Sequence, residues 1–141
     1  MIKKAAIFGF LLIALMLSCG WANAECIVIV NKSVTETSLA GRDIKLVFLG
    51  KKIKWSDGRK IHKAGLVNGA VHEEFLKKFV RKNPYSYSSF WKLMIVTGGG
   101  IPPKSFKTGK EVVKYVAGRE GAIGYISPKT PHNGVNVLHV E

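Results

Sequence analysis

A short leader at the amino terminus constrains this chain most, because it decides how much of the sequence is left to fold. Lys3 and Lys4 give a positive start, residues 5–17 are an apolar run, and residues 22–24 read Ala-Asn-Ala, a small-x-small cleavage motif. These three parts in this order are typical of a secretory signal peptide, and the apolar run is short for a mature membrane-spanning helix. We therefore expect a signal peptide at residues 1–24 and a folded domain at residues 25–141.

Two alternatives for the leader stay open. One is a membrane anchor that is never cleaved. The other is a lipoprotein, because residues 17–20 (Leu-Ser-Cys-Gly) form a partial lipobox that would place a lipid on Cys19. Met16 and Leu17 fit that motif poorly, so cleavage after Ala24 is the expectation. An export signal of this kind indicates the bacterial envelope, and the expected location is the periplasm.

The charge of the chain is strongly positive. It carries 22 Lys and Arg against 9 Asp and Glu, and only two of those basic residues lie in the leader. A surface of this sign concentrates anions, and nucleic acid would use the same charges. An exported protein rarely meets nucleic acid, so no nucleic-acid partner is expected. The alternative is a solvated basic surface with no special partner.

Cys26 is the one thiol that remains after cleavage, so no disulfide can form within the predicted domain. It is followed by Ile-Val-Ile-Val, a β-branched apolar run that predicts a buried strand. We favour a small core residue over a reactive thiol.

Strand-like and helix-like patterns alternate along the rest of the chain, which predicts an α/β layered domain. Ser38 is the expected N-cap of the first helix and Gly50 its stop, while Thr108 is the expected cap of the last helix. Residues 98–103 (Gly-Gly-Gly-Ile-Pro-Pro) predict a loop. The expected strands are residues 26–30, 60–67, 121–126 and 135–140, and the expected helices are residues 39–48, 70–82, a segment from Ser86 or Ser88 through Met94, and 109–117.

Catalytic motifs are missing from the sequence. It has no phosphate-binding Walker loop, no G-x-S-x-G elbow and no H-E-x-x-H helix, and its four histidines show no ligand spacing. Asp57, Glu73 and Glu74 are expected in a turn and on an exposed helix face, where carboxylates are usually solvated. We therefore expect no enzyme activity, no cofactor and no metal.

Four motifs resemble a known family. Residues 43–51 (Asp-Ile-Lys-Leu-Val-Phe-Leu-Gly-Lys) and 55–58 (Trp-Ser-Asp-Gly) look like the D-I-F-L-G-K and W-x-D-G segments of phosphate-type periplasmic solute-binding proteins of ABC transporters. Residues 28–32 resemble the preceding strand, residues 75–78 the following helix, and residues 121–125 (Gly-Ala-Ile-Gly-Tyr) the family's G-A-I-G-Y strand. The pieces follow the family's order across nearly the whole predicted domain.

The resemblance implies a fold and a function. Full-length members have two lobes and bind phosphate in the cleft between them for an ABC importer, and this chain is similar to the second-lobe stretch. It implies a single-lobe, type 2 periplasmic-binding-protein-like domain, with a mixed sheet flanked by helices. The implied function is that of a secreted solute-binding-like protein, whose partners are a small inorganic anion and an ABC transporter membrane component or another envelope protein.

The resemblance also places a binding site. In the family a G-S-G-T-R run opens a helix and holds the anion, and the aligned residues here are Asn68, Gly69, Ala70, Val71 and His72. Gly69, Val71 and His72 replace the Ser, the Thr and the Arg, so two hydroxyls and a guanidinium are lost. Each lost hydrogen bond to a charged group is worth about 1.5–3 kcal/mol. We expect weak binding of phosphate or an altered anion preference.

A second reading keeps the fold without the ligand. The chain would then be an interaction or accessory module of the envelope, with Trp55, Tyr85, Tyr87 and Trp91 as exposed contact residues, because aromatic side chains anchor interfaces. The alternative for each of these side chains is packing in the core.

Overall fold

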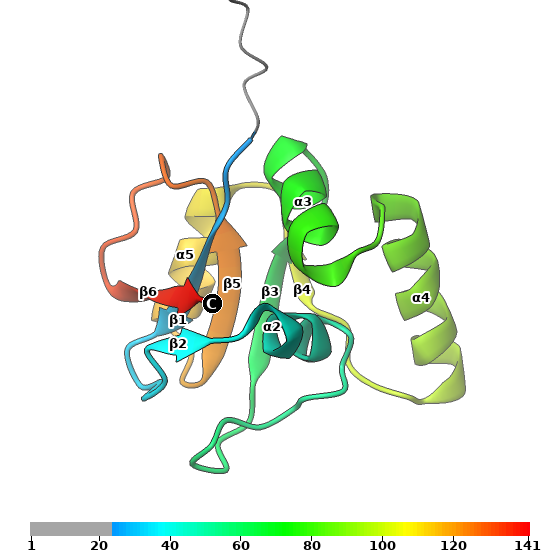
Figure 1. Ribbon diagram of the computed structural model, residues 1–141, viewed down its shortest axis with the longest axis horizontal. Coiled ribbons are helices and arrows are strands. Elements are labelled where there is room, and N and C mark those ends of the chain that lie inside the picture. Colours follow the sequence, from blue (N-terminus) through cyan, green and yellow to red (C-terminus); the bar gives the residue numbers. More distant parts are fainter. Residues whose placement is uncertain (1–23) are drawn as a thin grey trace, which may run out of the picture.

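A mixed sheet forms the centre of the molecule in the computed structural model, which describes residues 24–141 (Figure 1). The strand order is β2-β6-β1-β5-β3-β4. Strand β1 pairs antiparallel with β5 and β6, whereas β3 runs parallel to β4 and β5 and β2 runs parallel to β6. The strands are β1 (Ile27–Asn31), β2 (Ser38–Leu39), β3 (His62–Leu66), β4 (Lys104–Phe106), β5 (Ala122–Ile126) and β6 (Val135–Val140). Nearly all of the predicted signal peptide, together with Cys19, lies outside the described residues.

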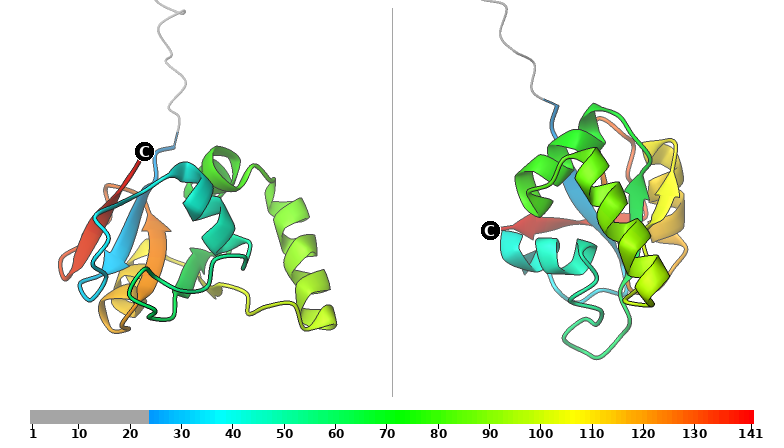
Figure 2. Two further views of the ribbon diagram at one scale, coloured as in Figure 1. Left: turned by 60° about the horizontal axis from the view of Figure 1, so that its bottom comes forward. Right: turned by 90° about the vertical axis from the view of Figure 1, so that its right-hand side faces the viewer.

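Helices cover both faces of this sheet (Figures 1 and 2). Helix α5 packs on one face, while α2 and α3 lie on the other, and α4 stands at the edge of the molecule beside β4. The helices are α2 (Gly41–Phe48), α3 (Ala70–Phe75), the π-helical segment η1 (Leu76–Val80), α4 (Pro84–Thr97) and α5 (Gly109–Ala117). The predicted class, a mixed α/β sheet flanked by helices, is confirmed. No helix in residues 24–141 is long and apolar enough to cross a membrane.

Strand β5 is buried along its whole length and joins the two layers. On one face, the ring of Tyr125 stacks on Phe75 with centroids 3.8 Å apart and lies edge-on to Phe48 at 5.8 Å. On the other face, Gly124 leaves room for α5, since a Cβ there would lie 2.8 Å from Val112 Cγ1. The absence of a side chain at Gly124 therefore sets how closely α5 approaches the sheet.

Two predicted helix starts are wrong. Ser38 belongs to the short strand β2, and α2 begins after Ala40 without a side-chain cap. Helix α4 begins at Pro84 rather than at Ser86 or Ser88, because the Asn83 side chain accepts a hydrogen bond of 2.8 Å from the Ser86 N–H. A proline is well tolerated in the first helical turn, where its missing N–H costs nothing. The predicted cap at Thr108 is confirmed, with its hydroxyl 3.2 Å from the Glu111 N–H.

The helix predicted over residues 70–82 is interrupted. It starts as α3 and continues as η1, until Arg81 adopts a left-handed conformation with φ 61°. The Arg81 N–H donates to the Leu76 carbonyl at 2.7 Å, the wider spacing of a π-turn. Leu76 and Val80, the first and last residues of η1, are both fully buried, so this segment packs against the core.

The close contact at Gly124 gives a stability test. Replacing Gly124 by Ala forces the new Cβ against Val112 and Val116, and overpacking of this kind costs about 1–3 kcal/mol. Thermal unfolding followed by circular dichroism should show a melting temperature lower by several degrees. The matched control is Gly41→Ala, where the nearest atom is 3.8 Å away and the helix start accepts alanine, so the melting temperature should be unchanged or slightly higher. Equal melting temperatures for the two variants would contradict the packing described here.

Candidate functional site

The residues predicted to bind the anion form the turn between β3 and the first turn of α3. Asn68, Gly69 and Ala70 are exposed, and Val71 is half-buried against the core. His72 is 7% exposed. Gly69 has a φ of 102°, a conformation that favours glycine, and it precedes a helix that has no side-chain cap. Of these residues, His72 is the one whose side chain reaches the interior.

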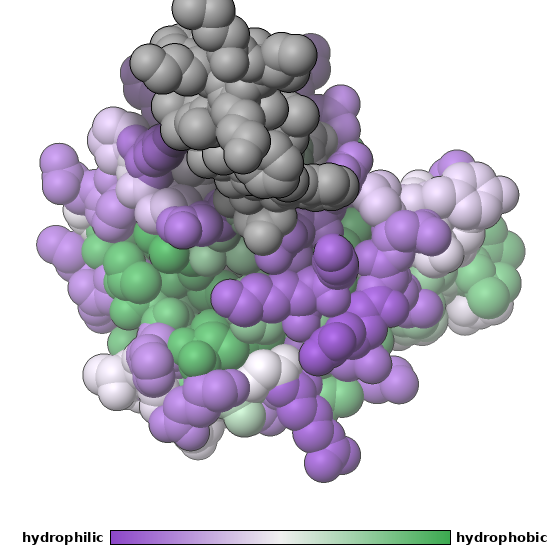
Figure 3. All heavy atoms as spheres, turned by 45° about the horizontal axis from the view of Figure 1, so that its top comes forward, coloured by the Kyte–Doolittle hydropathy of each residue, from purple (hydrophilic) through white to green (hydrophobic). Residues whose placement is uncertain are grey.

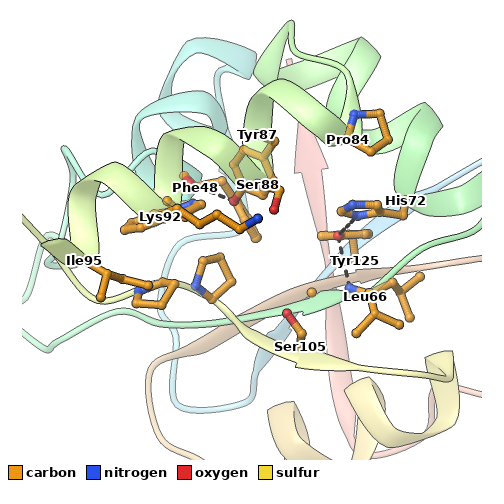
Figure 4. Close-up of a pocket in the computed structure, with 15 residues that line it drawn as sticks. Phe48, Leu66, His72, Pro84, Tyr87, Ser88, Lys92, Ile95, Ser105 and Tyr125 are labelled. Carbon is orange, nitrogen blue, oxygen red and sulfur yellow. Dashed lines mark hydrogen bonds between the residues drawn. The ribbon is translucent and has the colours of Figure 1, made fainter.

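A hydrogen-bonded chain fixes the His72 ring. Its Nδ1 lies 2.5 Å from the Tyr125 hydroxyl, and that hydroxyl accepts a hydrogen bond of 3.1 Å from the Leu66 N–H (Figure 4). Since Leu66 already donates to the hydroxyl oxygen, the one hydroxyl proton is free to point at His72. With the proton assigned in this way, the ring accepts at Nδ1 and carries its own proton on Nε2, which is one of its two neutral tautomers.

The electrostatics of this pair favour the same protonation states. Burial lowers the pKa of His72 below its ordinary value, and the nearby carboxylate of Glu73 opposes the change only in part. Burial also raises the pKa of Tyr125, so its hydroxyl keeps its proton. His72 is therefore a neutral hydrogen-bond donor at its Nε2 rather than a replacement for a charged arginine.

A hollow of about 300 Å³ opens beside His72, between α4, the carboxyl end of β3 and the segment at residues 102–105 that leads into β4. Apart from the hydroxyls of Tyr87 and Tyr125, which make hydrogen bonds within the protein, its polar side chains are His72, Ser88, Lys92 and Ser105, and Figure 4 shows them around the opening. Each can donate a hydrogen bond, and no carboxylate lines the hollow. A lining of this kind suits an anion or another hydrogen-bond acceptor.

The remaining wall of this hollow is apolar and rigid. Tyr87 donates from its hydroxyl to the Phe48 carbonyl at 2.8 Å, and burial raises the pKa of this hydroxyl, which therefore keeps its proton. The Trp91 N–H is itself buried and meets no acceptor at hydrogen-bond distance within residues 24–141. Apolar walls with a few placed polar groups are usual in small-molecule sites. The apolar lining consists of Phe48, Leu66, Val67, Pro84, Tyr87, Trp91, Ile95, Pro102 and Pro103.

Sequence reasoning did not identify Ser88, Lys92 and Ser105. Ser88 and Lys92 are four residues apart on α4, so one helix face presents both to the hollow, in line with Pro84. That spacing is readable in the sequence once the helix start at Pro84 is known. Ser105 lies on the three-residue strand β4, which has too little pattern to be recognised.

Three of the four aromatic side chains expected as surface contacts are instead buried. Trp55, Tyr87 and Trp91 are 3%, 8% and 5% exposed, so for these three the alternative of core packing is confirmed. The Trp55 indole N–H donates to the Gly121 carbonyl at 2.9 Å and helps to fix the turn before β5. Tyr85 is the exception, with 82% of its surface exposed.

The structure also shows the surroundings of the Cys26 thiol and of the side chains that could bind a metal. Cys26 is half-buried against the core with a free thiol, and burial is the main cause that raises its pKa. It is therefore a protonated packing residue rather than an activated nucleophile. Within the part of the chain that the structure describes, no three His, Cys, Asp or Glu side chains lie close enough to hold a metal ion.

Comparison with known proteins gives a clear result for the fold. No family model matches the sequence, and no curated protein sequence does. Among solved structures, PstS from Borrelia burgdorferi superimposes with a TM-score of 0.65 over 84% of this chain at 15% identity. An ABC-type phosphate transport receptor from Vibrio cholerae gives a TM-score of 0.57 over 83% of this chain at 12% identity. This chain has the fold of part of a phosphate transport receptor.

The phosphate-receptor fold confirms the resemblance predicted from the sequence motifs. The match covers 47% of the Borrelia chain and 46% of the Vibrio chain, so this protein spans slightly less than half of each. The solved structures that it resembles are transport receptors rather than enzymes by their names, in keeping with the non-enzymatic expectation.

Burial of His72 gives a pH test. Its pKa is lower in the folded protein than in the unfolded chain, so the unfolded state binds the proton more tightly. The free energy of unfolding should be constant at neutral pH and above and should decrease as pH falls through about 6.5. Urea unfolding between about pH 7.5 and about pH 5 should show this decrease, and His72→Gln should reduce it.

His62 retains part of the decrease in that variant, because burial and neighbouring cations lower its pKa as well. The exposed His139→Gln is the matched control and should keep the slope of the unmodified protein. An unchanged slope in His72→Gln would contradict the neutral, buried state of this ring.

Proposed function

We propose that this chain is an exported, periplasmic solute-binding-type protein that holds phosphate or another small anion weakly. The observation that carries the proposal is the hollow beside His72, where His72, Ser88, Lys92 and Ser105 can each donate a hydrogen bond and which no carboxylate lines. The phosphate-receptor fold supports the same reading.

The proposed roles follow from the chemistry of each group. Lys92 supplies the positive charge, the hydroxyls of Ser88 and Ser105 donate to anion oxygens, and His72 donates from Nε2. The exposed residues 68–71 form the rim that connects β3 to His72. The backbone N–H groups of this turn are further donors for a ligand oxygen.

The composition of the hollow explains why binding should be weak. A single lysine provides its charge, without the bidentate fork of an arginine. Most of the wall is apolar, so an anion with an apolar part, such as a small carboxylate, gains contacts that phosphate lacks. We therefore infer a preference that differs from that of a dedicated phosphate receptor.

Transport is the proposed context. By analogy with the receptors whose fold it shares, the chain would present its anion to a membrane component of an ABC transporter. Since it spans less than half of those receptors, closure of a second lobe over the ligand is not part of this proposal.

One observation favours the second function, an envelope interaction module. Helix α4 exposes apolar side chains along much of its length, and Figure 3 shows apolar residues at the right-hand margin where this helix lies. Two results together would favour this module: no anion gives heat in calorimetry, and an envelope protein is captured by the unmodified protein but not by variants of α4. The exposed apolar side chains are Tyr85, Leu93, Ile95 and Val96.

Titration calorimetry tests the anion proposal directly. Phosphate, sulfate and acetate at millimolar concentration should each give measurable heat, with Lys92→Gln weakening the best of them by about tenfold or more, the loss of one charged hydrogen bond. Lys110→Gln, an exposed lysine on α5 outside the hollow, is the matched control and should bind as the unmodified protein does. Absence of heat with all three anions, from a protein with normal thermal unfolding, would sink the proposal.

A further inference from the structure

A second, larger hollow lies at the opposite end of β3. It has a volume of about 660 Å³ and is bounded by the starts of β3 and β4, by the loop at residues 98–102 and by Tyr115 and Arg119. The first hollow lies at the carboxyl end of β3, and Pro102, just before β4, is the one residue that lines both hollows.

The charges around this second hollow all have one sign. Five basic side chains line it, and no Asp or Glu does. The ion pairs within residues 24–141 are Lys52 with Asp43 and Arg59 with Asp57, so none of the five is neutralised by an ion pair there. The basic side chains are Lys60, His62, Lys63, Lys104 and Arg119.

Aromatic rings hold two of these lysines in place. The Nζ of Lys63 lies 5.4 Å from the ring centroid of Trp91, and that of Lys104 lies 5.5 Å from Tyr115 and 6.0 Å from Phe106. Cation–π contacts at such distances orient an ammonium group without neutralising its charge. The two charges are therefore positioned in advance of any ligand.

The crowding of like charges has a measurable consequence. Burial lowers the pKa of His62, and Arg119, Lys60 and Lys63 lower it further. Burial lowers the pKa of Lys63 as well, and Lys60 adds to that change. The neighbouring cations therefore disfavour the charged forms of His62 and Lys63. A bound anion would offset this repulsion.

We propose that this second hollow, which we call the basic hollow, binds an anion that carries two or more phosphate-like groups. Its size is within the range of small-molecule sites, and one phosphate ion would occupy a small part of it. Its positive charges come from β3, from the loop before it, from β4 and from the turn after α5, so a ligand with several charged groups can contact cations on different sides. Ile53, Ile101 and Tyr115 supply an apolar surface between them.

The proposal is separate from the weak anion site beside His72. That site contains one lysine and a mostly apolar wall, whereas the basic hollow contains five basic groups. A singly phosphorylated small anion suits the first hollow and a multiply charged one suits the second. The two hollows can therefore be tested with different probes and different variants.

Calorimetry with tripolyphosphate and orthophosphate tests the basic hollow. In buffer of low ionic strength, tripolyphosphate should bind the unmodified protein at least about tenfold more tightly than orthophosphate. Lys63→Gln and Lys104→Gln should each weaken tripolyphosphate binding by about tenfold or more, while Lys129→Gln, an exposed lysine elsewhere, should change it by less than about twofold. Circular dichroism melts of the variants establish that each is folded.

Nuclear magnetic resonance adds a readout that general attraction to a basic surface would not give. Saturation with tripolyphosphate should raise the pKa of His62, because the bound anion favours the charged ring. The backbone amide signal of His139, which does not line the hollow, should stay in place. Equal losses in Lys129→Gln and Lys63→Gln, or an unchanged His62 pKa at saturation, would overturn the proposal. Lys92→Gln should leave tripolyphosphate binding intact. This variant therefore distinguishes failure of the basic-hollow proposal from failure of the proposed site beside His72.

Discussion

The hydroxyl of Tyr125 ties the sheet to the helical layer, and the first hollow depends on it. It accepts from the Leu66 N–H at the end of β3 and meets Nδ1 of His72 on α3. Gly65 makes this possible, since a Cβ at that position would lie 3.0 Å from the hydroxyl oxygen. Burying a polar group is costly unless it makes a hydrogen bond, so these hydrogen bonds fix the position of α3 relative to the sheet edge.

The two hollows lie at opposite ends of β3. At the carboxyl end, the neutral His72 and the face of α4 enclose a hollow with few charges. At the amino end, the lysines, His62 and Arg119 enclose a hollow without a carboxylate. The indole of Trp91 connects the two, because it lines the first hollow and holds Lys63 by a cation–π contact at the second.

Much of the fold follows from patterns that the sequence displays. The β-branched run after Cys26, the cap at Thr108 and the final two strands have strong local signals, and each lies close to where it was predicted. The short strands β2 and β4 were missed because their two and three residues contain too little alternation, and they exist through pairing with β6 and β3.

The candidate site was less predictable than the fold. The motif comparison led to residues 68–72, and His72 does line the first hollow. Its partner Tyr125 lies on β5, distant in the sequence, and Ser88 and Lys92 depend on where α4 starts. The basic hollow combines residues that are scattered along the chain, so only the folded arrangement brings their charges together. Net charge indicated an attraction for anions but could not place it.

The most direct measurement is a two-dimensional amide spectrum of the isotope-labelled protein, titrated with phosphate at millimolar concentrations. The account predicts shifts that saturate and are concentrated at Leu66, His72, Ser88 and Lys92, around the Tyr125 hydroxyl. Shifts that are absent there at the end of the titration, or that spread evenly over exposed lysines without saturating, would contradict it.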